Sequence, residues 1–201
     1  MRIQVNDRQI QTEKELLRAS LRRLPASAWP DPAAAGKAIA RRFEELAILR
    51  PQSGVAGFMA CGREPDLTGW LAAWLAAGGD LYLPVFDQTT GVYSLAAVTD
   101  LSAQLVIGHY AIREPLPELP KIHPPYGKEL IHAWLIPGVA FTRDGRRLGR
   151  GAGFYDRLLA GAEGAKIGVA IDCQIVDAMP TSPHDIRMDM LVTESQLIVC
   201  E

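Results

Sequence analysis

Two short apolar segments on either side of a helical pattern most constrain the fold of this chain. Residues 55–60 are typical of a short buried strand, and residues 81–85 are typical of a second one. Between them, apolar residues recur at helical spacing over 67–75, and Gly78 ends that pattern. A strand, a helix and a strand in this order form a βαβ unit, which implies parallel strands covered by helices.

The same alternation continues on both sides of this unit. A capping-box pattern at Thr12–Glu15 predicts a first helix that runs to about Arg23, and a second helix is predicted to end near Pro51. Residues 86–126 are proline-rich and less regular. The remaining strands are predicted over 105–108, 134–141, 167–171, 190–193 and 197–200. We therefore expect an α/β fold, with an open and mostly parallel sheet flanked by helices, in a single domain over 1–201.

Charge and hydropathy exclude several classes of partner. The formal net charge of −2 gives no overall attraction to nucleic acid or to a membrane surface. No apolar run approaches the length that spans a bilayer, and residues 1–7 lack the apolar core of a signal peptide. We therefore expect a cytoplasmic protein that binds neither nucleic acid nor membrane. Cys61, Cys173 and Cys200 are widely spaced and lack a metal-binding or redox pattern, so buried thiols are expected.

A glycine-rich basic loop at 145–157 is the strongest indication of a binding site. Glycines let the backbone approach a ligand with several N–H groups, and the helix predicted from Tyr155 adds a partial positive charge. Arg147 and Arg150 can supply full charges to an anion, and Asp156 can hold the magnesium ion of a nucleotide. The spacing matches neither the dinucleotide fingerprint nor the P-loop. A tight structural turn with solvated arginines therefore stays open as the alternative.

Two further groups of polar residues are candidates for ligand contacts. Lys14, Arg18 and Arg22 recur every four residues, which places them along one face of the first helix. Glu64 follows the strand at 55–60, so it should lie at the carboxyl edge of the sheet, where open α/β proteins bind ligands. The plain alternative for both groups is a solvated surface.

The order of these motifs resembles the 5-formyltetrahydrofolate cyclo-ligase family, also called methenyltetrahydrofolate synthetase. The resemblance rests on the Pro-Gly and Phe of the apolar run at 136–141, on the glycine loop, and on a later series of residues. That series is Gln174, Pro180, Asp185, Asp189, Thr193 and Glu194. The match is dense from Trp134 to Glu194 and looser back to Lys14. It implies a Rossmann-like sheet.

The resemblance also implies a reaction. The family uses ATP to convert 5-formyltetrahydrofolate into 5,10-methenyltetrahydrofolate, with release of ADP and phosphate. The γ-phosphate passes to the formyl oxygen, N10 attacks the activated carbon, and phosphate leaves. The implied cofactor is Mg²⁺, and the implied assembly is a monomer or a weak homodimer. A non-catalytic folate- or nucleotide-binding paralogue is the alternative, because a fold and a partial motif do not fix activity.

Individual residues receive roles from the same resemblance. Those implied for catalysis are Lys14, Arg150 and Asp156. Those implied for ATP binding are Lys14, Arg18, Arg147, Gly149, Arg150, Gly151, Ala152, Gly153, Phe154, Tyr155 and Asp156. Glu64, Met59 and Tyr155 are implied for the folate, and Asp156 with Asp189 for the metal. The chain departs from the family pattern at Leu67, Thr142 and Ala152, which we interpret as variation within an active enzyme.

Overall fold

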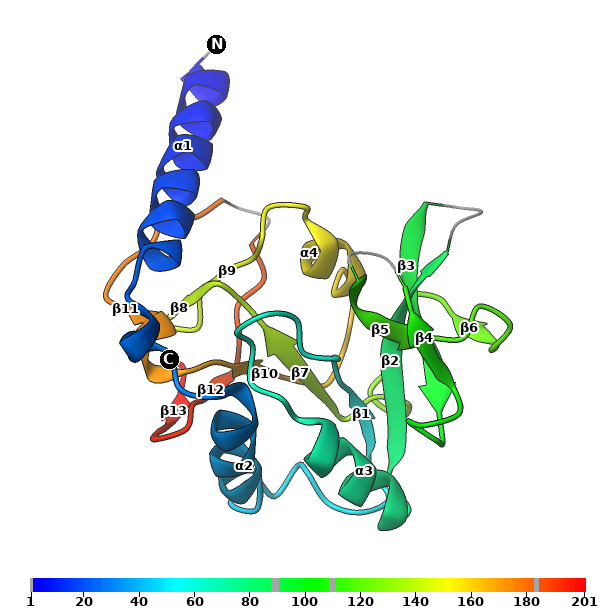
Figure 1. Ribbon diagram of the computed structural model, residues 1–201. Coiled ribbons are helices and arrows are strands. Elements are labelled where there is room, and N and C mark those ends of the chain that lie inside the picture. The colour runs from blue at the N-terminus through cyan, green and yellow to red at the C-terminus, as the bar shows by residue number, and fades with distance from the viewer. Residues whose placement is uncertain (1, 88–90, 109–110, 183–184) are drawn as a thin grey trace.

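The computed structural model describes residues 2–87, 91–108, 111–182 and 185–201 (Figure 1). Over these residues, an eight-stranded sheet forms the centre of the protein. Its strands, in spatial order, are β13 (Leu197–Val199), β12 (Met190–Val192), β10 (Ala165–Val169), β7 (Ala133–Pro137), β1 (Gly54–Ala56), β2 (Asp80–Asp87), β3 (Val92–Val98) and β6 (Lys121–Ile122). The strands from β12 to β2 are parallel, while β13, β3 and β6 are antiparallel additions at the edges. The predicted α/β fold with a mostly parallel sheet is confirmed.

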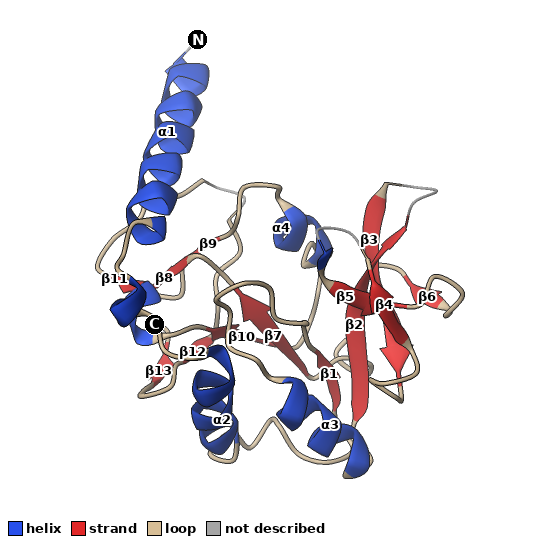
Figure 2. Ribbon diagram, viewed as in Figure 1, coloured by secondary structure: helices blue, strands red, loops and turns tan. Residues whose placement is uncertain are grey.

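The central strands bury side chains on both faces of the sheet. In β7, Leu135 packs in a cluster with α2 (Pro32–Phe43) and α3 (Thr68–Ala76), while Trp134 packs on the opposite face with residues of α4 (Phe154–Leu158). Figure 2 shows these helices around the sheet. Burial on both faces explains why the strand sequence is a continuous apolar run instead of an alternating one. The parallel pairing of β1 with β2 around α3 confirms the predicted βαβ unit.

The first helix differs from its prediction. The helix α1 extends over Arg2–Arg22, so it begins well before the capping-box pattern. The Thr12 hydroxyl donates a hydrogen bond to the carbonyl of Arg8 at 3.0 Å, and therefore bonds to the preceding turn instead of capping a helix start. The first turns of α1 project from the body of the protein (Figure 1). Leu21 anchors the other end of the helix in a small buried cluster with Leu148 and Met179.

The second helix ends earlier than predicted. Asp31 caps α2 by accepting a hydrogen bond from the Ala34 N–H at 2.9 Å, and a proline occupies the first helical position. The helix ends at Phe43 and not near Pro51. Leu46 is buried although it lies beyond the end of the helix, so the apolar pattern extends further along the chain than the helix does. Short 3₁₀ helices lie at Ala26–Ala28 and Asp172–Gln174.

The predicted strand at 134–141 is two strands in two sheets. After β7 the chain turns at Gly138 and enters β8 (Ala140–Thr142), which pairs with β9 (Arg147–Leu148) and β11 (Ile175–Val176) in a smaller sheet. A Cβ atom at Gly138 would lie 2.7 Å from the Phe141 ring, so the corner requires glycine. The Gln174 amide donates to the carbonyl of Gly138 at 2.7 Å and holds the corner. The β8 strand of the smaller sheet therefore lies between β7 and the glycine loop along the chain.

The middle of the chain contains more strand than predicted. The β2 and β3 strands form an antiparallel hairpin, whose second arm was not predicted. Its sequence, with Ser94 and Ala96 among the buried positions, lacks a clear alternation of large apolar residues. The predicted strand at 105–108 is present as β4 (Leu105–Ile107), paired with β5 (Arg113–Pro115). In the part of the chain that the structure describes, no helix has the length and hydropathy needed to cross a membrane.

Candidate active site

A cavity of about 1280 Å³ opens at the carboxyl ends of β1, β2 and β7. The other walls come from α1, the β3 strand, the glycine loop and the segment around Asp185. Pockets for one small molecule typically occupy about 300–1,000 Å³, so this cavity has room for two ligands. It contains every residue that the resemblance assigns to ATP and to folate, from Lys14 on α1 to Met59 and Glu64 after β1. Glu64 therefore lies at the carboxyl edge of the sheet, as predicted.

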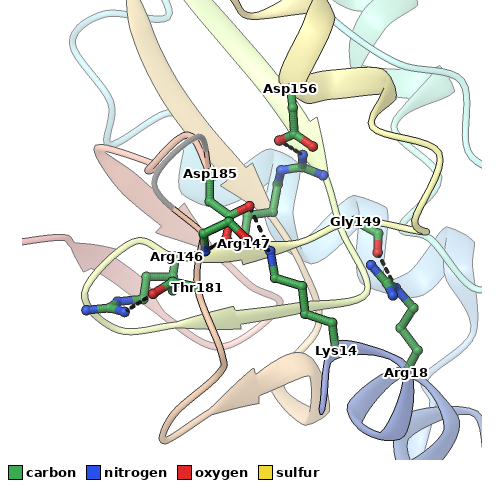
Figure 3. A network of polar contacts seen from close by, with 9 residues as sticks. Lys14, Arg18, Arg146, Arg147, Gly149, Asp156, Thr181 and Asp185 are labelled. Atoms are coloured by element: carbon green, nitrogen blue, oxygen red, sulfur yellow. Dashed lines mark hydrogen bonds and ion pairs between the residues drawn. The ribbon is translucent and has the colours of Figure 1, made fainter. Parts of the chain in front are cut away.

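Two cations of α1 reach into this cavity. Lys14 Nζ lies 2.8 and 2.7 Å from the two carboxylate oxygens of Asp185, and 3.4 Å from the hydroxyl of Ser182. Arg18 Nε donates a hydrogen bond to the carbonyl of Gly149 at 2.8 Å (Figure 3). Arg22, the third residue of the row, is exposed. Lys14 and Arg18 therefore form part of the cavity wall, whereas Arg22 lies on the solvated surface of the helix.

The glycine loop has a backbone that other residues adopt poorly. Gly151 has a φ of +107° and Gly153 a φ of +63°, both in the region where a Cβ atom causes strain. At Gly149, a Cβ atom would lie 2.9 Å from a guanidinium nitrogen of Arg147. The helix that follows, α4, has only five residues. Because a helix dipole sums over aligned peptide units, it adds little charge here, and the arginines and loop N–H groups supply most of it.

Arg147 lies beneath the loop instead of in solvent. Its side chain is 4% exposed, and Nη2 donates to the Asp156 carboxylate at 3.1 Å (Figure 3). The guanidinium carbon lies 5.3 Å from the centre of the Tyr155 ring, and Nε has no hydrogen-bond partner among the described residues. The Asp156 side chain remains 40% exposed at the cavity. Arg147 thus orients two residues that face the ligand space.

Arg150 joins the two halves of the cavity. Its Nη2 lies 2.7 Å from Oε1 of Glu64 and 2.9 Å from the Cys61 carbonyl, while Nη1 lies 3.5 Å from the Cys61 sulfur. The other oxygen of Glu64 accepts the Cys61 N–H at 2.9 Å. Burial raises the pKa of Glu64, and the charge of Arg150 partly opposes that rise. A residue predicted to bind phosphate is therefore paired with one predicted to bind folate.

An aromatic row crosses the cavity from the β2–β3 hairpin to α4. Successive ring centres of Phe86, Tyr93, Phe154 and Tyr155 lie 4.9, 4.0 and 4.6 Å apart. All four residues line the cavity, where flat rings can pack against a heterocycle. Burial raises the pKa of the Tyr155 hydroxyl. Sequence reasoning missed Phe86 and Tyr93, because β3 was not recognised as a strand returning to this edge.

Asp189 does not join Asp156, and the predicted pairing of these carboxylates around one metal is wrong. Asp189 precedes β12, and its Oδ2 accepts the N–H of Lys166, near the start of β10, at 2.6 Å. It therefore lies at the amino ends of the parallel strands, opposite the cavity. Its four-residue spacing from Asp185 would put both on one helical face, but the segment is not helical.

Comparisons with known proteins agree with this geometry. A sequence model described as the 5-formyltetrahydrofolate cyclo-ligase family matches residues 10–194. This chain belongs to that family. A 5-formyltetrahydrofolate cyclo-ligase of Mycolicibacterium smegmatis is 32% identical over 183 residues, which cover 76% of this chain and 93% of that protein. The cyclo-ligase of Escherichia coli K12 is 32% identical over 146 residues, which cover 71% of this chain and 79% of that protein.

Solved structures of the same kind share the fold. The NMR structure of Aquifex aeolicus 5,10-methenyltetrahydrofolate synthetase has a TM-score of 0.74 and 28% identity, and covers 94% of this chain and 91% of that chain. A Mycoplasma pneumoniae 5,10-methenyltetrahydrofolate synthetase, with a TM-score of 0.64 and 18% identity over 92% of this chain and 98% of that one, supports the fold alone. The predicted cyclo-ligase family and fold are confirmed, and the family is one of ATP-dependent enzymes.

Proposed function

We propose that this cyclo-ligase converts 5-formyltetrahydrofolate into 5,10-methenyltetrahydrofolate and converts ATP into ADP and phosphate. The observation that carries the proposal is the shared cavity in which Lys14, Arg150 and Asp156 meet Glu64. A phosphate-binding set and a folate-binding set in one enclosure allow a phosphoryl group to pass directly between two ligands. Such a transfer depends chiefly on positioning and charge neutralisation.

On the nucleotide side, the chain offers cations and backbone donors. Lys14 and Arg18 bind phosphate oxygens from α1, and the N–H groups of residues 149–153 approach from the glycine loop. Lys14 is paired with Asp185 at the cavity wall. Binding of ATP therefore exchanges a carboxylate partner for a phosphate partner, so Lys14 carries its full charge to the group that is transferred.

Asp156 is the residue that would hold a magnesium ion. No group of three or more His, Cys, Asp or Glu residues suited to a metal occurs within the described ranges. Mg²⁺ in nucleotide sites commonly uses one or two carboxylates, with phosphates and water as the other ligands. A single oriented and partly exposed Asp156 fits that requirement. When bound, the ion would neutralise phosphate charge, and Arg147 would keep the carboxylate turned toward it.

On the folate side, Glu64 accepts hydrogen bonds from the pterin, and Tyr155 with its aromatic neighbours packs against flat rings. The formyl oxygen attacks the γ-phosphorus, and the bond from that phosphorus to the bridging oxygen of ADP breaks. N10 then attacks the activated formyl carbon and loses its proton. Departure of phosphate with the former formyl oxygen leaves the methenyl bridge between N5 and N10.

An absorbance assay tests this function. Purified protein with 5-formyltetrahydrofolate and Mg-ATP is expected to form the methenyl chromophore, and omission of ATP is expected to abolish it. Ligand binding without product would contradict the proposal and would favour the non-catalytic binding paralogue. The single domain over 1–201, the monomer or weak homodimer and the cytoplasmic location stay predictions.

A further inference from the structure

The Glu64–Arg150 ion pair has the properties of a latch between the two ligand sites. One partner comes from the loop after β1, and the other from the glycine loop. Both oxygens of Glu64 are engaged, one by Arg150 and one by the Cys61 N–H. While the pair is intact, the groups that join Arg150 and Glu64 are not available for hydrogen bonds to a ligand. The proposed function requires Arg150 at a phosphate and Glu64 at the folate.

The two partners differ in their freedom to leave. The Arg150 side chain is 56% exposed, whereas the Glu64 side chain is 12% exposed. Arg150 can therefore swing to a phosphate, while Glu64 stays buried beside Cys61. Once Arg150 has moved away, the buried Glu64 carboxylate lacks its counter-charge. Hydrogen bonds from N–H donors of a ligand then stabilise it more than they would stabilise a solvated carboxylate.

We infer that the Glu64–Arg150 latch couples nucleotide binding to folate binding, so that each ligand raises the affinity of the enzyme for the other. This inference rests on the proposed function. Whichever ligand binds first supplies the free energy that opens the latch, and the second ligand meets an open pair. The apparent affinity of the first ligand is its intrinsic affinity multiplied by the fraction of protein in which the latch is open. Because coupling is reciprocal, both ligands must gain affinity by the same factor.

The test measures binding of the non-hydrolysable ATP analogue AMP-PNP with Mg²⁺ by titration calorimetry. With wild-type protein, saturating 5-formyltetrahydrofolate is expected to tighten binding of the analogue by about fivefold or more. Without folate, Glu64→Gln is expected to bind the analogue tighter than wild type by a similar factor, although Glu64 is assigned to the folate. Loss of a merely structural residue would not tighten binding of the other ligand.

Two further variants separate the latch from general charge effects. Glu64→Asp keeps the negative charge but shortens the side chain by one methylene, which breaks the 2.7 Å contact, so it too is expected to tighten analogue binding. Asp66→Asn removes an exposed charge from the same loop and is expected to leave analogue binding within about twofold of wild type. If only Glu64→Gln tightened binding, bulk charge would be the cause and the latch would be wrong.

Failure of the latch differs from failure of the proposed function. Wild-type protein that forms methenyl product but shows no coupling, or whose Glu64 variants bind the analogue no tighter, would overturn the latch alone. Wild-type protein that forms no product would overturn the proposed function, and the latch with it. Thermal unfolding of each variant establishes that it is folded before its affinity is compared.

Discussion

Lys14 Nζ lies 2.7 Å from Oδ2 of Asp185, across 171 residues of sequence. The Lys14 side chain is 8% exposed, so the pair is largely shielded from solvent. Under the proposed function, ATP phosphates would compete with the Asp185 carboxylate for the same ammonium group. The contact also holds α1 against the segment before β12. The hydrogen bond from Arg18 to Gly149 holds the same helix against the glycine loop.

Replacing Lys14 should impair the nucleotide half of the reaction. We expect Lys14→Met to lower kcat/KM for ATP by about 10²-fold or more, because a charge aimed at the transferred phosphate is lost. The affinity for 5-formyltetrahydrofolate, measured by calorimetry without ATP, should change little. Arg22→Met, on the exposed end of the same helix, is the matched control and should retain wild-type turnover. Equal turnover in both variants would exclude Lys14 from the mechanism.

Asp156 and Arg147 should differ in how they affect the metal requirement. Asp156→Asn is expected to reduce turnover by about 10²-fold or more and to raise the Mg²⁺ concentration that gives half-maximal rate. Arg147→Lys should raise that Mg²⁺ concentration with a smaller effect on turnover, since it disturbs the orientation of Asp156 but keeps the carboxylate itself. Addition of a chelator to wild-type protein should stop the reaction. An unchanged Mg²⁺ dependence in both variants would contradict the assignment.

Replacing Asp189, in contrast to Asp156, should leave the metal requirement unchanged. It accepts a hydrogen bond from the Lys166 backbone at the amino ends of the strands, and asparagine can keep that bond with its amide oxygen. Asp189→Asn should therefore retain both wild-type turnover and wild-type Mg²⁺ dependence. A large rise in the Mg²⁺ requirement would restore the metal role that the sequence predicted.

Glycine substitutions should affect the free energy of unfolding differently at two positions. Gly151→Ala is expected to lower it by about 1–3 kcal/mol and to weaken ATP use, because φ is +107° there. Gly69 lies on the exposed side of α3, where an added Cβ atom would meet no neighbour within 4 Å. Gly69→Ala should therefore be neutral or stabilising by up to about 1 kcal/mol. Urea unfolding measures both, and equal stabilities would contradict the loop geometry.

Glu64 should make stability depend on pH. Burial raises the pKa of Glu64 above its ordinary value of 4.5, so the folded protein holds this proton more tightly than the unfolded chain. The stabilising contribution of the protonated form is complete below pH 4.5 and is lost as the pH rises through the folded-state pKa. The free energy of unfolding of wild type should thus fall relative to Glu64→Gln over this interval, as measured by urea unfolding. A difference that stayed constant with pH would exclude the shift.

The sequence predicted those parts of the fold that depend on local pattern. The apolar run at 81–85 and the helix ending before Gly78 are confirmed, because burial on both faces demands apolar strands and glycine ends the helix. The hairpin strand β3 was missed, since small residues such as Ser94 can be buried without a periodic signal. Such strands are set by their neighbours in the sheet, which the sequence alone does not reveal.

The site was predictable residue by residue but not in its contacts. The glycine loop, Glu64 and Lys14 meet in one cavity as expected. Glu64 lies there because it follows β1 at the carboxyl edge of the sheet, and Lys14 reaches the same cavity from α1. The burial of Arg147 and the pairing of Arg150 with Glu64 depend on how the chain leaves β7, whereas Asp189 is separated from Asp156 because it lies at the start of β12. A single corner at Gly138, held by Gln174, decides that path.

The contact between Lys14 and Asp185 also has a consequence for synthesis of the protein. This wall of the cavity combines a helix with a segment that is translated 171 residues later. Domains generally fold as units while the amino-terminal part emerges from the ribosome first. Lys14 on α1 therefore has no Asp185 partner until that segment is made, so a nascent chain halted before residue 185 would lack both this ion pair and a complete cavity wall.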